Sequence, residues 1–361
     1  MDRPPLPVVK YAQFCERLNE KVIAQRIPIK GSFELTFRCN LSCLHCYCNL
    51  PLNNQDAIDK ELTREEVFSI LDQIAEEGCL WLLLTGGEPL LRKDFLEIYA
   101  YAKKKGFLIS LFTNGTIITP KIADYLAEWL PLLVEITLYG ATEEIYEKVT
   151  GIPGSFKRCQ RGIELLLERK IPLGLKTMAM TLNRNELSNI REYAEGLGVK
   201  FRFDPIINPK LDGSRAPCNF RLSPEEVVKL DLADEKRVKE WREFCYKFIG
   251  PLQDEYLFNC GAGISTFHID PYGQMSSCEM TRFQNYDLRR GSFKEGWHHF
   301  IPELLALKPA SDYPCGQCEL ISLCGQCPGW AYLENGNPET PVEYLCQIAH
   351  LRAEAFKTKK I

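Results

Sequence analysis

Two periods of hydrophobic positions alternate along residues 32–208. Stretches with an apolar residue at every third or fourth position are typical of amphipathic helices, and the shorter apolar or β-branched runs between them are typical of strands. The strands are expected at residues 33–37, 80–84, 107–112, 132–138, 173–180 and 200–206. The helices are expected at residues 63–77, 93–105, 120–128, 142–170 (interrupted at 151–154) and 186–197. This alternation predicts parallel βα units and an α/β fold.

The number of these units limits the architecture. Six strands are too few for a closed eight-stranded barrel, so a partial barrel or an open parallel sheet is expected. Thr63 and Glu66 have the spacing of a capping box at the start of the first of these helices. The continuous apolar run of residues 80–84 predicts a strand that is buried on both faces.

The regular alternation ends after Asn208, and the composition shifts toward cysteine, glycine and short turns from Cys260 onward. The chain is therefore expected to have five segments. They are an N-terminal segment with a helix near residues 11–25 (1–31), the βα units (32–208), a helical linker (209–254), a cysteine-rich region (255–350) and a tail (351–361). The last two helices are expected at residues 223–250 and 341–356.

Composition and charge exclude several classes of protein. With 361 residues, 45% of them hydrophobic and 25% charged, the chain has the composition of a globular protein and not of a disordered or fibrous one. A net charge of −4 argues against a dedicated nucleic-acid-binding protein. No apolar run is long enough for a membrane span, and the N-terminus lacks the apolar stretch of a signal peptide. A cytoplasmic protein is expected.

Clustered cysteines are the strongest chemical signal in the chain. There are 16 of them, and a chain of this length without an export signal does not need disulfides. Cys39, Cys43 and Cys46 follow the first expected strand with the spacing C-x3-C-x2-C. Three thiolates can hold a [4Fe–4S] cluster and leave its fourth iron open to another ligand. A structural zinc site completed by Cys48 or His45 is the alternative.

A second group of cysteines lies in the C-terminal region. It comprises Cys260, Cys278, Cys315, Cys318, Cys324, Cys327 and Cys346. Two C-x2-C pairs lie within residues 315–327, and this spacing suits a zinc ribbon as well as an iron–sulfur site. The spacing by itself therefore leaves both kinds of metal site open.

Three further motifs each stand at the end of an expected strand. Thr85-Gly86-Gly87-Glu88-Pro89 follows the second strand, Thr113-Asn114-Gly115 the third, and Thr137-Leu138-Tyr139-Gly140 the fourth. Together with the first three cysteines, this order of motifs resembles the radical S-adenosylmethionine (radical SAM) superfamily. The resemblance implies a partial (β/α)6 barrel whose active site lies at the carboxyl ends of its strands.

The resemblance also implies roles for individual residues. Cys39, Cys43 and Cys46 would bind a [4Fe–4S] cluster, whose open iron would bind S-adenosylmethionine (SAM). Contacts with SAM would come from Gly86, Gly87, Glu88, Pro89, Asn114, Thr137, Lys176 and His45, with Lys176 as the partner of the SAM carboxylate. An external one-electron donor of the flavodoxin or ferredoxin type would start the cleavage of SAM to a 5′-deoxyadenosyl radical, which would abstract a hydrogen atom from the substrate.

The cysteines of the C-terminal region resemble those of the SPASM extension, which binds auxiliary iron–sulfur clusters. The resemblance implies two [4Fe–4S] clusters, one on Cys315, Cys318, Cys324 and Cys346, and the other on Cys260, Cys278 and Cys327. The sequence departs from the pattern in two ways. Two residues instead of the usual three separate Cys324 from Cys327, and no cysteine lies just upstream of Cys260, where Asp254 is a candidate non-thiolate ligand.

Enzymes with this extension mostly modify peptides or proteins. The resemblance implies the oxidation or cross-linking of a peptide or protein side chain, with an auxiliary cluster as the acceptor of the second electron. Glu279, directly after Cys278, is the candidate catalytic base. Two alternatives stay open: a sulfatase-maturase-like oxidation of a protein Cys or Ser, and the oxidation of a small-molecule or tetrapyrrole side chain.

The expected partners follow from the same interpretation. They are a peptide or protein substrate and the external electron donor, without nucleic acid or membrane. Only 38 residues precede Cys39, which is too few for a peptide-recognition domain. Leader-peptide binding is therefore expected from a separate partner protein or from direct contact with the core.

Overall fold

The computed structural model describes residues 11–48, 50–248 and 255–356. Within these residues the main sheet has nine strands in the order β11-β10-β9-β1-β4-β5-β6-β7-β8. Their bounds are β1 Lys30–Thr36, β4 Trp81–Gly86, β5 Leu108–Thr113, β6 Leu133–Thr137, β7 Leu173–Met178, β8 Lys200–Asp204, β9 Thr266–Ile269, β10 Gln274–Ser276 and β11 Tyr286–Asp287. The strands from β1 through β8 in this order are parallel neighbours, which confirms the six expected βα units.

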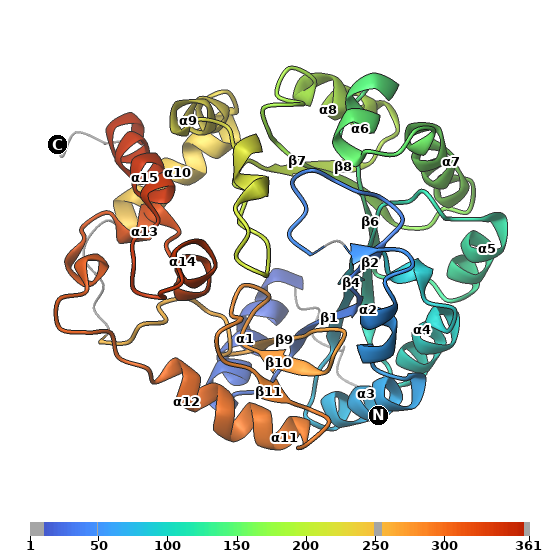
Figure 1. Cartoon of the computed structure of the whole chain (residues 1–361), viewed down its shortest axis with the longest axis horizontal. Coiled ribbons are helices and arrows are strands. Elements are labelled where there is room, and N and C mark those ends of the chain that lie inside the picture. The colour runs from blue at the N-terminus through green and yellow to red at the C-terminus, as the bar shows by residue number, and fades with distance from the viewer. Residues whose placement is uncertain (1–10, 49, 249–254, 357–361) are drawn as a thin grey trace, which may run out of the picture.

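Helices lie along the outside of these strands (Figure 1). They are α3 Arg64–Glu76, α4 Phe95–Lys104, α5 Pro120–Glu128, α6 Glu143–Thr150, α7 Ser155–Glu168 and α8 Leu187–Gly196. The interruption expected within residues 142–170 is the turn between α6 and α7, where Gly151 ends α6 in the left-handed conformation. The expected α/β partial barrel is therefore confirmed.

The two faces of the barrel sheet differ in polarity. In β1, Phe33 and Leu35 are fully buried in the main core, whereas Glu34 faces the other side and binds polar partners. The apolar run in β4 forms the expected strand, but its two faces are unequal. Leu82 and Leu84 are buried, whereas Leu83 is half-buried and lines a cavity. Core packing therefore occupies the helix side of the sheet, and the inner face is free for polar groups.

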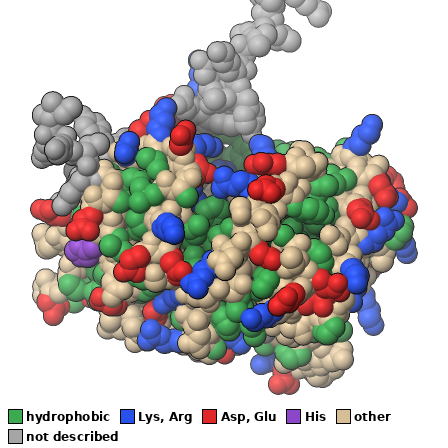
Figure 2. Space-filling model, turned by 90° about the horizontal axis from the view of Figure 1, so that it is seen from above, with side chains coloured by type: hydrophobic (Ala, Val, Ile, Leu, Met, Phe, Trp, Pro, Cys, Tyr) green, Lys and Arg blue, Asp and Glu red, His purple; other side chains and the backbone are tan. Residues whose placement is uncertain are grey.

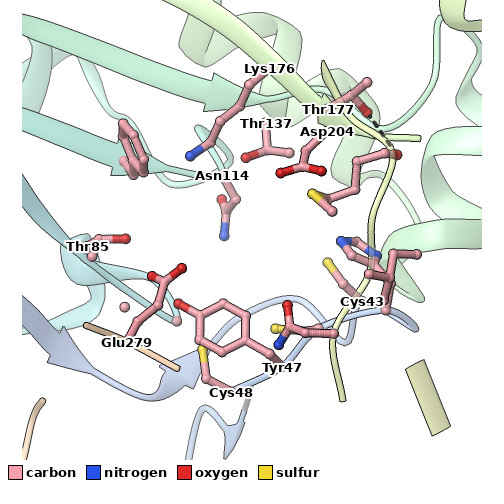
Figure 3. A pocket seen from close by; sticks show the side chains of 18 of the residues that line it. Cys43, Tyr47, Cys48, Thr85, Asn114, Thr137, Lys176, Thr177, Asp204 and Glu279 are labelled. Atoms are coloured by element: carbon pink, nitrogen blue, oxygen red, sulfur yellow. Dashed lines mark hydrogen bonds between the residues drawn. The ribbon is translucent and has the colours of Figure 1, made fainter. Parts of the chain in front are cut away.

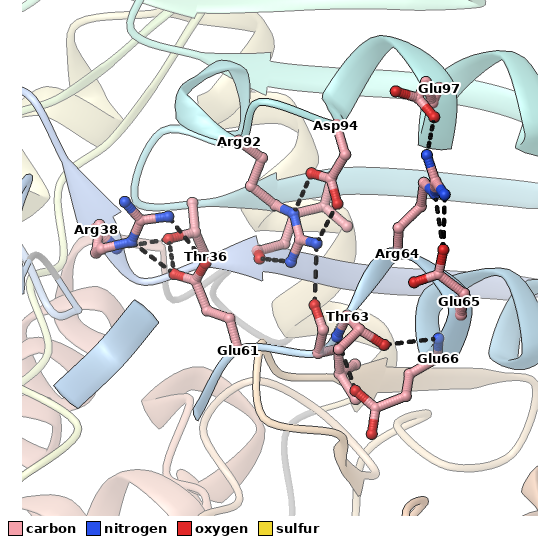
Figure 4. A network of polar contacts seen from close by, with 12 residues as sticks. Thr36, Arg38, Glu61, Thr63, Arg64, Glu65, Glu66, Arg92, Asp94 and Glu97 are labelled. Atoms are coloured by element: carbon pink, nitrogen blue, oxygen red, sulfur yellow. Dashed lines mark hydrogen bonds and ion pairs between the residues drawn. The ribbon is translucent and has the colours of Figure 1, made fainter. Parts of the chain in front are cut away.

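Polar contacts fix the start of α3 and the loops beside it (Figure 4). Thr63 and Glu66 form the expected capping box, in which each side chain bonds the other residue's backbone N–H. The buried Arg92 guanidinium binds Asp94 and donates to the carbonyls of Leu35 and Leu62. This arginine thereby links β1 to the segment that leads into α3.

The C-terminal region adds three strands to the barrel sheet. β9 pairs in parallel with β1, with Lys30 opposite Thr266 and Phe33 opposite Ile269. β10 and β11 continue the sheet in antiparallel order. The cysteine-rich region is thus joined to the barrel by backbone pairing.

The remaining helices gather on the side of the molecule away from α4–α7 (Figure 1). They include α9 Pro224–Leu232, α10 Glu235–Phe248, α13 Ile321–Cys324, α14 Pro328–Asn335 and α15 Glu343–Phe356. The single helix expected at 223–250 is wrong, because the chain breaks at Asp234, whose carboxylate accepts from the backbone N–H groups of Lys236 and Arg237. The helices expected at 11–25 and 341–356 are present as α1 Tyr11–Gln25 and α15.

The outer surface carries mixed charge. On the face that Figure 2 shows, Lys and Arg side chains alternate with Asp and Glu. Of the helices in the described part of the chain, none combines the length and the apolar composition that crossing a lipid bilayer requires.

One close backbone contact gives a test of this packing. A Cβ added to Gly162 in α7 would lie 2.1 Å from the Gly115 carbonyl oxygen in the turn after β5. We predict that Gly162→Ala lowers the free energy of unfolding by about 1–3 kcal/mol, because backbone atoms would have to move apart. Gly196→Ala in α8 is the control, since its Cβ would meet nothing within 4 Å. Chemical denaturation of both variants checks the difference, and equal stabilities would contradict the packing.

Candidate active site

A cavity of about 400 Å³ lies at the carboxyl ends of the barrel strands. Every barrel strand from β4 to β8 contributes to it, through Thr85, Phe112, Thr137, Lys176 and Asp204, among others. The loop with the first cysteines forms another wall, and Glu279, Met280 and Trp330 of the C-terminal region close the remaining side. Figure 3 shows these side chains converging from several elements on one space. The cavity therefore lies between the barrel and the C-terminal region.

Cys39, Cys43 and Cys46 line one end of this cavity. Cys39 ends β2 (Arg38–Cys39), and Cys43 and Cys46 lie in the loop between this strand and β3 (Leu50–Pro51). Arg38 pairs with the Glu61 carboxylate through Nε at 2.8 Å and Nη2 at 2.9 Å, which holds the entry to the loop. The backbone N–H groups of Ser42 and Leu44 donate to carbonyls at the end of α6. The sequence thus places three thiols on a loop that is anchored at several points.

The three thiols influence one another. Burial, together with the neighbouring Glu88 and Cys46, raises the pKa of Cys39 to about 12. Burial and the proximity of Cys46 and Cys39 likewise raise the pKa of Cys43. Without a metal Cys39 and Cys43 are therefore protonated at neutral pH, and metal binding would displace their protons. Within the described ranges no three Cys, His, Asp or Glu side chains converge as a ready-made site for a single metal ion.

The donor set nevertheless fits a [4Fe–4S] cluster. Thiolates are the ligands that such clusters use, and here three of them share one end of a cavity large enough for further ligands. Cys48 also lines the cavity, and its thiol is hydrogen-bonded to that of Cys46. The sequence analysis named Cys48 only as a completing zinc ligand.

Gly86 and Gly87 bring the end of β4 against the chain that enters the cysteine loop. Gly86 has a φ of 128°, and a Cβ there would lie 2.2 Å from the Thr36 carbonyl oxygen. A Cβ on Gly87 would lie 2.3 Å from the Arg38 carbonyl oxygen. Both glycines line the cavity, so their backbone is open to a ligand on one side and packed on the other.

Glu88 and Pro89 stand behind the cavity and do not line it. The Glu88 side chain is fully buried and accepts hydrogen bonds from Thr113 Oγ1 (2.8 Å), the Asn114 N–H (2.7 Å) and the Leu90 N–H (3.1 Å). Burial raises its pKa to about 7, against the effect of these donors. Glu88 therefore joins the loop after β4 to the turn after β5, and Pro89 begins the short helix η1 (Pro89–Leu91).

The other four expected SAM contacts all line the cavity: His45, Asn114, Thr137 and Lys176. The Asn114 side chain donates to Asn40 Oδ1 at 2.9 Å and to Cys39 Sγ at 3.6 Å. His45 packs edge-on against Tyr139 with 4.8 Å between ring centroids, and its buried Nδ1 has no hydrogen-bond partner. A buried nitrogen of this kind calls for a ligand partner.

Lys176 is a cation on the opposite wall. Its Nζ lies 3.1 Å from the centroid of the Phe112 ring and 3.9 Å from Glu135 Oε2, while Arg202 binds the same carboxylate. Burial lowers the pKa of Lys176 to about 7, although Glu135 acts in the opposite direction. Figure 3 shows its amine pointing into the cavity. Lys176 is thus available to a bound anion.

The C-terminal cysteines fall into two groups. Cys278 and Cys260 raise the pKa of Cys327, so these three lie near one another. The second group shows the same mutual effect and consists of Cys315, Cys318, Cys324 and Cys346. Gly325, in the left-handed conformation with a φ of 70°, turns the chain between Cys324 and Cys327. This turn allows two cysteines so close in sequence to belong to different groups.

Sequence reasoning missed several residues of the cavity. Tyr47 and Trp330 line it, although no motif marked them beyond their proximity to Cys46 and Cys327. Arg202 and Asp204, in the last half of β8, and Tyr139, just after β6, also line it. The expected catalytic base, Glu279, does face the cavity. Asp254 lies outside the described residues.

Comparisons with known proteins agree with this geometry. Residues 33–195 match the model of the Radical SAM superfamily. The AdoMet-dependent heme synthase of Methanosarcina barkeri is 27% identical over 334 residues, which cover 85% of this chain and 93% of the relative. The mycofactocin maturase MftC of Mycobacterium tuberculosis is 28% identical over 308 residues, which cover 82% of this chain and 77% of the relative.

A solved structure shows the same fold. Streptococcus suis SuiB bound to its precursor peptide SuiA superposes with a TM-score of 0.68 at 14% identity, over 96% of this chain and 84% of SuiB. The likeness therefore includes the C-terminal region. Residues 33–195 therefore form a radical SAM domain, which the C-terminal region follows. The chain is similar to radical SAM enzymes along most of its length. Members of this superfamily bind a [4Fe–4S] cluster and SAM.

The buried Glu88 gives a second test. Both of its oxygens accept from backbone N–H groups, so a glutamine would turn its own N–H group toward one of these donors. We predict that Glu88→Gln lowers the free energy of unfolding by about 1–3 kcal/mol, the cost of an unsatisfied buried donor. Glu144→Gln, on an exposed position of α6, should change it by less than about 0.5 kcal/mol. Denaturant titration at pH 8 measures both values.

Proposed function

We propose that this chain oxidises a side chain of a peptide or protein substrate, with SAM consumed as co-substrate. The observation that supports the proposal is the cavity itself, which is lined on one side by Cys39, Cys43 and Cys46 and on the other by the segment that follows Cys278. A substrate group in this cavity would lie between a radical source and an electron acceptor. Removal of one hydrogen atom, one electron and one proton is a net two-electron oxidation.

Residues of the barrel would bind the cofactors. Cys39, Cys43 and Cys46 would hold the [4Fe–4S] cluster, and the cavity-facing groups of Gly86, Gly87, Asn114, Thr137, Lys176 and His45 would contact SAM. When bound, cluster and SAM supply the 5′-deoxyadenosyl radical that takes a hydrogen atom from the substrate. Glu88 and Pro89 would support the SAM loop from behind, since neither lines the cavity.

The C-terminal cysteines would hold two auxiliary [4Fe–4S] clusters. One would be bound by Cys260, Cys278 and Cys327, the group next to the cavity, and the other by Cys315, Cys318, Cys324 and Cys346. Glu279 follows a ligand of the nearer cluster and faces the cavity, so it would accept the substrate proton while that cluster accepts the electron. These thiols must stay reduced, and we therefore expect the enzyme to work in the cytoplasm.

The peptide substrate is supported by two similarities. MftC is described as a mycofactocin maturase, and SuiB was solved with a precursor peptide. We expect an external flavodoxin- or ferredoxin-type protein as the electron donor, and a separate protein as a possible source of leader-peptide binding. The alternative oxidation of a protein Cys or Ser would use the same groups.

A tetrapyrrole side chain is the second candidate substrate. It is favoured by the match to an AdoMet-dependent heme synthase, which covers 93% of that relative. Anaerobic incubation with SAM, dithionite and either an iron porphyrin or a peptide encoded beside this gene distinguishes the tetrapyrrole substrate from the peptide substrate. A mass change in the peptide alone supports the first proposal, and one in the porphyrin alone overturns it.

The proposed clusters predict a defined metal content and two classes of cysteine variant. The reconstituted protein should contain roughly twelve irons per chain and negligible zinc. Cys43→Ala should abolish SAM cleavage, whereas Cys315→Ala should lower the iron content and spare most cleavage. Elemental analysis and chromatography of 5′-deoxyadenosine measure these effects. About four irons with stoichiometric zinc would remove the auxiliary clusters from the mechanism, and normal cleavage by Cys43→Ala would contradict the SAM site.

Lys176 predicts a pH dependence of SAM binding. Its pKa in the empty cavity is lowered to about 7, so the amine is charged below this pH and neutral above it. A carboxylate binds the charged form, so the Kd for SAM should be constant below pH 7 and rise up to about tenfold per pH unit above it. Equilibrium dialysis of the reconstituted, unreduced enzyme measures the Kd. Lys176→Met should bind weakly at every pH, and a wild-type-like profile in that variant would show that another group pairs with SAM.

A further inference from the structure

Arg282 lies four residues after Cys278, but its side chain turns back into the molecule and is only 10% exposed. Its Nε donates to the Glu279 carbonyl oxygen at 2.7 Å. Its Nη2 donates to Glu34 Oε2 at 3.1 Å, and its Nη1 donates to Asp270 Oδ2 at 3.4 Å. One guanidinium therefore holds the backbone beside Cys278, a barrel strand and the turn after β9.

Glu34 is the centre of these contacts. It is fully buried in β1 and accepts hydrogen bonds from Tyr47 Oη at 2.8 Å and from His268 Nε2 at 3.1 Å, in addition to Arg282. Burial alone would raise the pKa of Glu34, but His268 and Arg282 bring it below its ordinary value. The carboxylate is therefore charged, and it joins the residue after Cys46 to the segment after Cys278.

The segment of residues 278–282 is also held from its other side. A Cβ added to Gly329 in α14 would lie 2.6 Å from the Met280 carbonyl oxygen, so α14 packs directly on this backbone. Ser276 Oγ donates to the Cys278 carbonyl oxygen at 2.8 Å. Figure 3 shows Glu279 near Tyr47 at the cavity wall, and Glu279 adds to the effect of burial in raising the pKa of the Tyr47 hydroxyl. The segment thus lies between β1 and α14 with little freedom to move.

We propose that Arg282 is a positioning residue, which fixes Cys278 and Glu279 relative to the SAM side of the cavity through its bonds to Glu34 and the Glu279 carbonyl. The inference rests on the proposed function, because it assigns Cys278 and Glu279 to electron and proton removal. SAM cleavage itself needs only the barrel cysteines. Loss of Arg282 should therefore disturb the side of the cavity next to Cys278 and Glu279 and leave the side with the barrel cysteines intact.

The test uses Arg282→Met combined with Glu34→Gln, because the single variant would leave Glu34 charged and buried without its main partner. Arg290→Met is the matched control, since Arg290 is in the same region and its side chain is 88% exposed. Hydrogen–deuterium exchange of the metal-free proteins is the first measurement. Amides of residues 276–284 should exchange at least tenfold faster in the double variant than in the control, with unchanged exchange at residues 39–46.

The second measurement uses the reconstituted proteins with dithionite and SAM. In the double variant the EPR signal of the auxiliary cluster on the Cys278 group should change its g-values, while 5′-deoxyadenosine formation stays within twofold of wild type. Unchanged exchange and an unchanged signal would overturn the proposal and leave Arg282 as a stabilising residue only. If wild type shows no auxiliary signal, the proposed function fails, and the exchange measurement still decides the role of Arg282.

Discussion

The parallel pairing of β9 with β1 is the interaction on which the cavity depends. Without it, the barrel strands would present an unpaired edge at β1, and the segment after β9 would have no fixed position beside the barrel. Because β1 also leads into the cysteine loop, this one strand fixes the position of both walls. The buried ion pair of Glu34 with Arg282 and the hydrogen bond between His268 and Glu34 cross the same junction. Backbone and side-chain contacts therefore specify one register between the two regions.

The inner face of the barrel shows why such a junction can contain charge. Glu34 of β1 and Glu135, Lys176 and Arg202 of β6, β7 and β8 project toward the interior, and each has at least one partner of opposite charge. A buried charge is tolerated when it is paired and hydrogen-bonded. The apolar core lies on the helix side of the same strands, which leaves the interior available for polar cofactors and substrate.

The sequence predicted the barrel better than the C-terminal region, for physical reasons. Long amphipathic helices and apolar strands have a clear period, and caps such as Thr63–Glu66 depend on neighbours in sequence. β9, β10 and β11 are four, three and two residues long, too short to show a period. β9 pairs with β1, more than two hundred residues away, and β10 and β11 extend the sheet from β9. The expected domain boundaries remain predictions.

The residues of the candidate site likewise fall into those that the sequence predicted and those that it did not. The spacing of Cys39, Cys43 and Cys46 marked them as candidate metal ligands, and they line the cavity. Strand-end residues such as Thr137 were found because parallel strands share one carboxyl edge. Tyr47, Trp330 and Arg282 were not found, because their positions depend on contacts between distant segments. Glu88 matched a motif, but only the structure shows that its side chain points away from the cavity into a buried network.

The two walls of the cavity are held by different kinds of contact. The barrel wall depends on close backbone approaches, such as those of Gly86 and Gly87, where any side chain would collide. The wall after Cys278 has one such approach, of Gly329 to the Met280 carbonyl, and otherwise depends on the Arg282 side chain and its hydrogen bonds. Backbone packing allows few alternatives, whereas side-chain contacts can change one residue at a time. A fold of this design can keep the barrel wall of its cavity constant while the opposite wall changes.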